Sequence, residues 1–199
     1  MQKIQSMSKA QHLTFLGLMT ALVVVLQLMG TFIRFGLFSV SLVLIPIVLG
    51  AALAGPLEGA WLGFVFGAAV LLSGDANLFI SVSIPGTLIT VLVKGTAAGL
   101  IAGLVYRLIE KKNRWVAILA AAIVCPVVNT GVFFAGCYLF FFDFLSAGAN
   151  EAGKSVFLYI ITVMIGGNFL FELLFNVALS PAVLRLTEVG EKIFRNRKR

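Results

Sequence analysis

The sequence predicts an all-α membrane protein: one domain, built as a six-transmembrane-helix bundle with both termini cytoplasmic. Of its 199 residues, 60% are hydrophobic and only 12% are charged. A soluble domain of this size cannot bury that much apolar surface. The apolar residues form long uninterrupted runs, as membrane-spanning helices require. The positive charges gather at the ends of these runs, where they act as topology signals.

Six apolar runs fit membrane spans. We predict spans over residues 13–29, 37–54, 57–72, 84–106, 115–140 and 156–184. Gly55 and Pro56 join the second span to the third, because glycine permits a tight turn and proline favours the first helical position. The polar, turn-rich segments 73–83 and 141–155 are predicted to be loops. The run 13–29 is long for a signal peptide, so we expect it to be the first span.

Basic residues are unequally divided between the two sides of this arrangement. An even number of spans places both termini on one side, and that side carries Lys3, Lys9, Arg107, Lys111, Lys112, Arg114, Arg185, Lys192, Arg195, Arg197, Lys198 and Arg199. The opposite loops carry Arg34 and Lys154. Cytoplasmic loops hold the excess of Lys and Arg, so both termini are expected in the cytoplasm. This distribution accounts for the net charge of +7, and we expect no nucleic-acid binding.

Lys94 and Glu172 each lie well inside an apolar run. An ionisable side chain at such a position is costly and indicates a functional site. Two interpretations remain open. The two opposite charges can form a buried pair that only fixes the helix register, or both can face a polar ligand.

Further polar residues accompany this pair. Asn168, Glu172 and Asn176 follow one another at four-residue spacing, so they share one face of a helix. Polar groups left facing lipid cost several kcal/mol, and we therefore expect them to converge on a pocket that opens outward. The predicted substrate-binding residues are Arg34, Thr87, Thr90, Lys94, Asn129, Asn168, Glu172 and Asn176.

Small residues recur at four-residue spacing in three spans. They are Gly55, Gly59, Gly63 and Gly67 in the third, Gly95, Gly99 and Gly103 in the fourth, and Gly17 and Ala21 in the first. Such stripes let membrane helices approach closely. For the third and fourth spans we expect packing within the bundle. For the first span we expect docking to another protein.

Signatures of enzymes are missing from the sequence. The single histidine, His12, lies near the predicted cytoplasmic terminus, which does not support a Ser-His hydrolase or a His-ligated metal site. No Gly-x-x-x-x-Gly-Lys-Ser/Thr phosphate loop is present. We therefore expect no enzymatic activity, no cofactor and no metal. Any ATP hydrolysis must come from a partner.

Three stretches carry a resemblance to a known family. They read IPIVLGAALAGPLEGAWLGFVFG, KGTAAGLIAGLVYRLIEKK and NFLFELLFNVALSPAVLRL. With six spans in about this length and a Gly-Pro turn between the second and third, the chain resembles the substrate-binding S component of an energy-coupling factor vitamin transporter. The resemblance covers essentially the whole chain.

The resemblance implies a set of partners. An S component binds a vitamin or related micronutrient at the outer face of a bacterial cell membrane, in a pocket gated by external loops. It then docks to a transmembrane coupling subunit and two cytoplasmic ATPases. Docking in the family uses an Ala-x-x-x-Ala pattern on the first span. Here Gly17 and Ala21 occupy the matching positions, which keeps small residues but departs from the motif.

The polar residues favour pantothenate slightly, with riboflavin next. Lys94 and Arg34 can meet a carboxylate, while the amide side chains can meet hydroxyl and amide groups. Trp61, with Tyr138 or Tyr159, can stack on a flavin. A self-contained secondary transporter or channel is the alternative, although no inverted repeat is evident. A small membrane enzyme is a third and weaker possibility, for want of catalytic residues.

Overall fold

The computed structural model describes residues 8–30, 34–35, 38–39 and 42–196, and this part of the chain is mostly helical. The longer helices are α1 (Lys9–Gly30), α3 (Pro56–Ser73), α5 (Ile84–Ile109), α6 (Arg114–Phe140) and α9 (Gly166–Asn196). The shorter elements are β1 (Arg34–Phe35), β2 (Phe38–Ser39), α2 (Leu44–Leu53), α4 (Asn77–Ile80), α7 (Phe142–Glu151), α8 (Val156–Tyr159) and the π-helix η2 (Ile160–Ile165).

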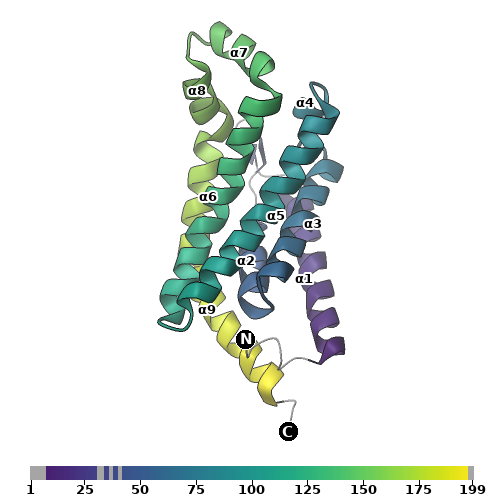
Figure 1. Ribbon diagram of the computed structural model, residues 1–199, viewed down its shortest axis with the longest axis vertical. Helices are drawn as coiled ribbons and strands as arrows, with labels where there is room; N and C mark the ends of the chain where they lie inside the picture. The colour runs from purple at the N-terminus through teal and green to yellow at the C-terminus, as the bar shows by residue number, and fades with distance from the viewer. Residues whose placement is uncertain (1–7, 31–33, 36–37, 40–41, 197–199) are drawn as a thin grey trace.

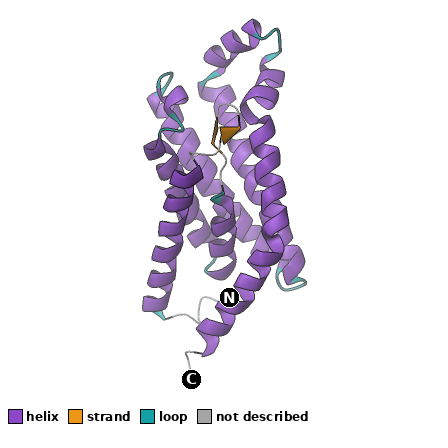
Figure 2. Cartoon of the chain, turned by 180° about the vertical axis from the view of Figure 1, so that it is seen from behind, coloured by secondary structure: helices purple, strands orange, loops and turns teal. Residues whose placement is uncertain are grey.

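The long helices run along the molecule and form a bundle with two distinct ends (Figure 1). One end, here called the termini end, holds the start of α1, the end of α9 and the turn between α5 and α6. The other end, here called the α4–α7 end, holds α4 and α7. The antiparallel hairpin of β1 and β2 lies between the helices towards the α4–α7 end (Figure 2).

Within the described residues, five segments are long and apolar enough to cross a membrane. They are Lys9–Gly30, Pro56–Ser73, Ile84–Ile109, Arg114–Phe140 and Val156–Gly190. Large apolar side chains cover the outside of the bundle, among them Leu13, Leu72, Leu108 and Leu139, which are 73–87% exposed. Lipid contact accounts for such a surface. The prediction of a helical membrane bundle is confirmed at this level, whereas six spans and cytoplasmic termini stay predictions.

The predicted second span, residues 37–54, is wrong in its extent. Phe38 and Ser39 form strand β2, and helix α2 covers only Leu44–Leu53. Ten residues of helix measure roughly 15 Å at 1.5 Å per residue, about half of a bilayer core. Every residue of α2 except Ile45 is buried. The short helix is therefore an internal element, enclosed by the longer helices.

Turn and capping residues explain where several helices begin. Gly55 has a φ of 137°, which only glycine adopts readily, and Pro56 then opens α3. The Ser83 hydroxyl accepts a hydrogen bond of 3.2 Å from the backbone N–H of Gly86 at the start of α5. The carboxamide oxygen of Asn113 accepts one of 3.2 Å from Val116 at the start of α6. These caps satisfy backbone groups that a helix terminus leaves free.

The glycine stripes of α3 and α5 face each other. A Cβ atom on Gly63 or on Gly95 would collide with the backbone carbonyl of the other residue. A Cβ on Gly59 would lie 2.5 Å from the carbonyl oxygen of Gly99. The two helices thus touch through their backbones, as small-residue stripes allow. The prediction that these stripes pack inside the bundle is confirmed.

Both segments that were predicted to be loops contain helices. Segment 73–83 includes α4, and segment 141–155 includes α7. Gly74, with a φ of 83°, ends α3 in the left-handed conformation and begins the corner that leads to α4. The predicted last span, 156–184, also continues further, because α9 ends at Asn196. These differences arise because helix ends and short helices have weak sequence signals.

Candidate functional site

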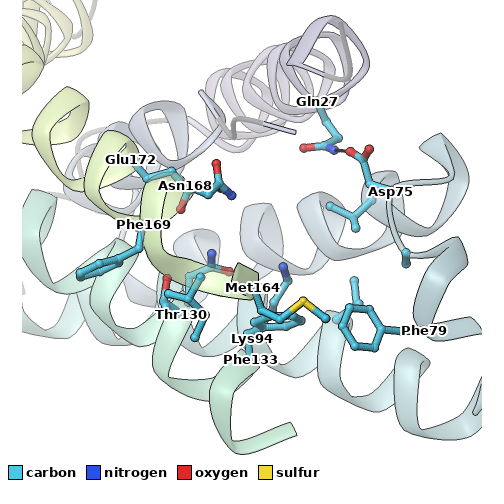
Figure 3. Close-up of a pocket in the computed structure, with 15 residues that line it drawn as sticks. Gln27, Asp75, Phe79, Lys94, Thr130, Phe133, Met164, Asn168, Phe169 and Glu172 are labelled. Atoms are coloured by element: carbon cyan, nitrogen blue, oxygen red, sulfur yellow. Dashed lines mark hydrogen bonds between the residues drawn. The ribbon is translucent and has the colours of Figure 1, made fainter. Parts of the chain in front are cut away.

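A pocket lies inside the bundle, in the half nearer the α4–α7 end. Its walls come from α1, the corner between α3 and α4, α5, α6, η2 and α9. The lining residues are Gln27, Val70, Asp75, Ala76, Phe79, Val91, Lys94, Asn129, Thr130, Phe133, Met164, Ile165, Asn168, Phe169 and Glu172 (Figure 3). The space open to the centres of water molecules is about 70 Å³, room for several waters.

Lys94 lies on α5 and is half-buried. Its Nζ atom lies 5.2 Å from the ring centre of Phe133 and 5.6 Å from that of Phe66. Among the described residues, its ammonium group makes no hydrogen bond or ion pair. Glu172 and Asp75 attract it only through space. Two aromatic faces partly replace the lost hydration of the ammonium, and its hydrogen-bond donors remain available to a solute.

Glu172 lies on the opposite wall, on α9, and is 3% exposed. The Asn168 side chain donates a hydrogen bond of 3.4 Å from Nδ2 to its Oε1 atom. Asn176 donates from Nδ2 to the backbone oxygen of Glu172 at 2.8 Å. The four-residue spacing therefore joins these three residues by hydrogen bonds along one helix face, as the sequence predicts. A structural Lys94–Glu172 ion pair is not formed in the described structure.

Gln27 and Asp75 supply a second polar wall (Figure 3). Gln27 lies near the end of α1 and is 1% exposed. Its Nε2 atom donates a hydrogen bond of 2.8 Å to Oδ2 of Asp75, which follows Gly74 in the α3–α4 corner. This bond links two elements that are far apart in the sequence. It also brings a carboxylate to the pocket.

Three amide oxygens in the pocket lining lack a hydrogen-bond partner among the described residues. They are Gln27 Oε1, Asn129 Oδ1 and Asn168 Oδ1. Buried polar atoms in proteins are nearly always paired, and an unpaired one costs about 1–3 kcal/mol. Water or a solute that brings N–H or O–H donors would satisfy all three.

Aromatic side chains form a large part of the apolar lining. Phe79 packs edge-on against Phe133 with ring centres 5.5 Å apart, and Phe169 lines the pocket from α9. Met164 comes from the π-helix η2. Single π-turns occur frequently at functional sites. An apolar wall with a few convergent polar groups is typical of small-molecule pockets.

The structure brings together part of the predicted set. Lys94, Asn129, Asn168 and Glu172 line the pocket. Thr87, Thr90 and Asn176 are buried but are not among the lining residues. Arg34 belongs to strand β1, and its side chain lies outside the described part of the chain. A role in solute binding stays a prediction for all eight residues.

The Thr87 and Thr90 side chains have local explanations. The Thr87 hydroxyl donates a hydrogen bond of 2.7 Å to the backbone oxygen of Ser83, a common use of threonine within a helix. Thr90 packs against Gly136 of α6, where an added Cβ would collide with it. The Thr87 hydroxyl is therefore paired at the start of its own helix, whereas the Thr90 hydroxyl lies at the contact with α6 and has no hydrogen-bond partner among the described residues.

Gln27 and Asp75 were missed by the sequence-based reasoning. The signal was present for Gln27, because it is a polar residue in an otherwise apolar run and such residues avoid lipid. Asp75 was one polar residue among several in segment 73–83. Its proximity to Gln27 depends on how α1 packs against the α3–α4 corner.

Gly17 and Ala21, the predicted docking residues, lie on the exposed side of α1. A Cβ atom added to Gly17 would meet nothing within 4 Å, in contrast to the glycines of α3 and α5. The structure thus leaves this pair uncovered within the described chain. Its use as a docking surface stays a prediction.

No group of three or more His, Cys, Asp or Glu side chains that could hold a metal occurs in the described residues. His12, the single histidine, instead bonds to Glu58 through Nε2 and Oε1 at 3.0 Å. This contact joins α1 to the first turn of α3 near the termini end.

The apolar helices and the pocket between them define the class: a multi-pass membrane protein with a pocket lined by apolar and polar side chains. The family model for the substrate-specific component of ECF transporters matches residues 11–184. The chain therefore belongs to this family. Neither the curated proteins nor the solved structures gave a match.

Membership of the family places the chain among the substrate-specific subunits of ECF transporters. Members of this class bind a substrate for transport and are not enzymes. The predicted resemblance is confirmed.

Proposed function

We propose that this subunit captures a vitamin or related micronutrient outside a bacterial cell and binds it in the pocket around Lys94. A separate transmembrane coupling subunit and two cytoplasmic ATPases then drive delivery, with Gly17 and Ala21 in the docking surface. Both termini lie in the cytoplasm, so the α4–α7 end faces outward. The distribution of Lys and Arg supports this orientation.

The observation that carries the proposal is Lys94, which makes no ion pair with the described residues, beside three amide oxygens that are unpaired in the same part of the chain. An ammonium group with free donors suits a carboxylate, since charge-assisted hydrogen bonds are strong. Unpaired carbonyl oxygens suit hydroxyl and N–H groups. Asp75 and Glu172 already accept hydrogen bonds from Gln27 and Asn168. The complementary solute is a small molecule with one carboxylate and several donors.

Pantothenate has this composition, because it combines a carboxylate, hydroxyl groups and an amide N–H. It is the preferred substrate. Riboflavin is the second candidate, and the phenylalanine rings of the pocket favour it. Phe79, Phe133 and Phe169 offer apolar faces on which a flat ring system can stack. Riboflavin has hydroxyl donors but no carboxylate for Lys94.

The test has two stages. Small molecules carried through purification are identified by mass spectrometry, and the purified protein is then titrated with a panel of water-soluble vitamins in a calorimeter. We expect tight binding of pantothenate and weaker or no binding of riboflavin. Tighter binding of riboflavin than of pantothenate would make riboflavin the preferred substrate. If no vitamin binds, the proposed capture function is wrong.

A transport assay separates this function from that of a self-contained transporter. Liposomes that contain the subunit alone, with a pH gradient imposed, should not accumulate the bound vitamin. Liposomes that also contain the coupling subunit and the ATPases should accumulate it when ATP is supplied. Accumulation by the subunit alone would favour secondary transport.

A further inference from the structure

Gln27 is a pocket residue whose side-chain amide has a hydrogen-bonded nitrogen and an unpaired oxygen among the described residues. Its Nε2 atom donates to Asp75 at 2.8 Å, while its Oε1 atom is buried and has no partner among the described residues. The whole residue is 1% exposed. In Figure 3 the amide nitrogen faces Asp75, and the oxygen faces the side on which Asn168 and Glu172 lie.

Asp75 determines this orientation through its hydrogen-bonding chemistry. An ionised carboxylate only accepts hydrogen bonds, so it must face the N–H side of a carboxamide. The opposite amide orientation would set Gln27 Oε1 against the carboxylate. The left-handed Gly74, with a φ of 83°, places Asp75 directly after the end of α3. The corner therefore holds the carboxylate against α1, and the carboxylate directs the amide.

We infer that Gln27 is a specificity-determining residue: Oε1 accepts a hydrogen bond from an O–H or N–H of the bound solute, and Asp75 is the positioning residue that presents it. This inference rests on the proposed function. A site built to pair with a donor rejects an analogue without that donor, because the buried carbonyl is then left unpaired. Through Gln27, helix α1 takes part in choosing the solute.

The inference is tested with three variants. Gln27→Met keeps the length and apolar stem of the side chain but removes the acceptor. Asp75→Asn keeps a hydrogen bond to Gln27 but lets either amide orientation form. Thr20→Val is the control, because Thr20 also links α1 to α3, through a 3.1 Å hydrogen bond from Trp61 Nε1, and it does not line the pocket.

Binding is measured by calorimetry with pantothenate and riboflavin as probes. Each probe is compared with analogues in which one donor is blocked: the O-methyl ethers of pantothenate and N3-methylriboflavin. In the wild type, at least one blocked analogue of the vitamin that binds should be weaker by about tenfold, the size of one lost hydrogen bond. In Gln27→Met the ratio of the Kd of that blocked analogue to the Kd of the unmodified vitamin should fall below about twofold.

Asp75→Asn should lower this ratio to a value between those of the wild type and Gln27→Met, because the Gln27 amide adopts the opposite orientation in part of the molecules. Thr20→Val should leave the ratio unchanged. A purely structural role for Gln27 and Asp75 would change stability but not the ratio, so ratios equal to the wild-type values in both variants overturn the inference. If Gln27→Met does not fold, the ratio in Asp75→Asn alone decides, and a ratio equal to the wild-type value overturns the inference.

Failure of the wild type to bind either vitamin overturns the proposed function, and this inference with it.

Discussion

Lys94 shows how a charged residue is accommodated within an apolar bundle without an ion pair to any residue that the structure describes. The Phe66 and Phe133 rings lie within 6 Å of its ammonium group, and the side chain borders a cavity. The acids Glu172 and Asp75 have hydrogen-bond partners of their own. A residue arranged in this way contributes little to holding helices together and is available to a ligand.

Replacement of Lys94 tests this description. Lys94→Met should weaken pantothenate binding by more than about tenfold, roughly 1.4 kcal/mol, because the carboxylate loses its partner. The thermal unfolding temperature should stay at or above the wild-type value, since no buried pair is broken. Calorimetry and thermal unfolding in detergent provide the two measurements. Lys111→Met, at an exposed position in the turn that follows α5, is the control.

A loss of stability in Lys94→Met would indicate that Lys94 has a structural role. If Lys94→Met folds poorly and the double variant Lys94→Met/Glu172→Leu folds well, the two charges depend on each other for stability. The structure predicts no such rescue, because Lys94 and Glu172 are not within ion-pair distance in it.

At the scale of elements, the contact between α3 and α5 is the tightest feature of the described bundle. The glycines of one helix meet backbone atoms of the other, so even a methyl group cannot be added without displacing a helix. Phe66 of α3 and Lys94 of α5 come from the same helix pair. This contact therefore also determines where one wall of the pocket lies.

Gly63→Ala should destabilise the protein by about 1–3 kcal/mol, the usual cost of overpacking. The matched control is Gly131→Ala in α6, where an added Cβ meets nothing within 4 Å. There the higher helix propensity of alanine should stabilise by up to about 1 kcal/mol. Thermal unfolding in detergent compares the two. Equal effects in both variants would show that the α3–α5 contact is looser than described.

Helix α2 shows where element prediction from sequence fails. Residues 37–54 are continuously apolar enough to resemble a span, yet the helix forms only over Leu44–Leu53. Apolar composition marks a segment that avoids water, and both lipid exposure and enclosure by other helices satisfy that requirement. The α2 sequence alone does not distinguish the two. The surrounding helices do.

At the scale of the whole molecule, the chain passes back and forth between two ends that differ in charge. Lys111, Lys112 and Arg114 lie at the turn between α5 and α6, on the same end as the start of α1 (Figure 1). The positive-inside rule assigns that end to the cytoplasm. In the proposed orientation, the pocket lies nearer the end that faces outward.

Cysteine labelling in intact cells tests the orientation. Glu151→Cys in α7 should react with a membrane-impermeant maleimide, whereas Lys112→Cys should react only after lysis. Both positions are exposed. The two natural cysteines, Cys125 and Cys137, are buried, so the unaltered protein serves as the background control. If only Lys112→Cys were labelled in intact cells, the termini would lie outside the cell and the predicted topology would be wrong.

We propose that the exposed small residues Gly17 and Ala21 of α1 serve assembly rather than solute binding. Gly17→Leu combined with Ala21→Leu should leave vitamin affinity unchanged, because neither residue lines the pocket. It should reduce vitamin uptake at least about tenfold when the coupling subunit and ATPases are present, since bulky side chains prevent close helix approach. Co-purification and uptake assays measure this. Normal uptake would show that docking uses another face.

By itself, the sequence determined the membrane environment, most of the long helices, the glycine contact and the presence of polar residues in apolar spans. These features follow from local composition and from helical periodicity, since lipid penalises every exposed polar group. Asn129, Asn168 and Glu172 were predictable for that reason. We also expected them to converge with Lys94 on one cavity, because polar groups exposed to lipid are costly.

Only the tertiary structure decided which polar residues share the pocket. Thr87 and Asn176 satisfied the same sequence criteria as Lys94, yet they bond to nearby backbone. The Gln27–Asp75 bond joins residues 48 positions apart, and no local pattern encodes that distance. Its formation depends on the packing of α1 against the α3–α4 corner. Packing between distant helices also encloses α2, so the pocket is a property of the assembled bundle.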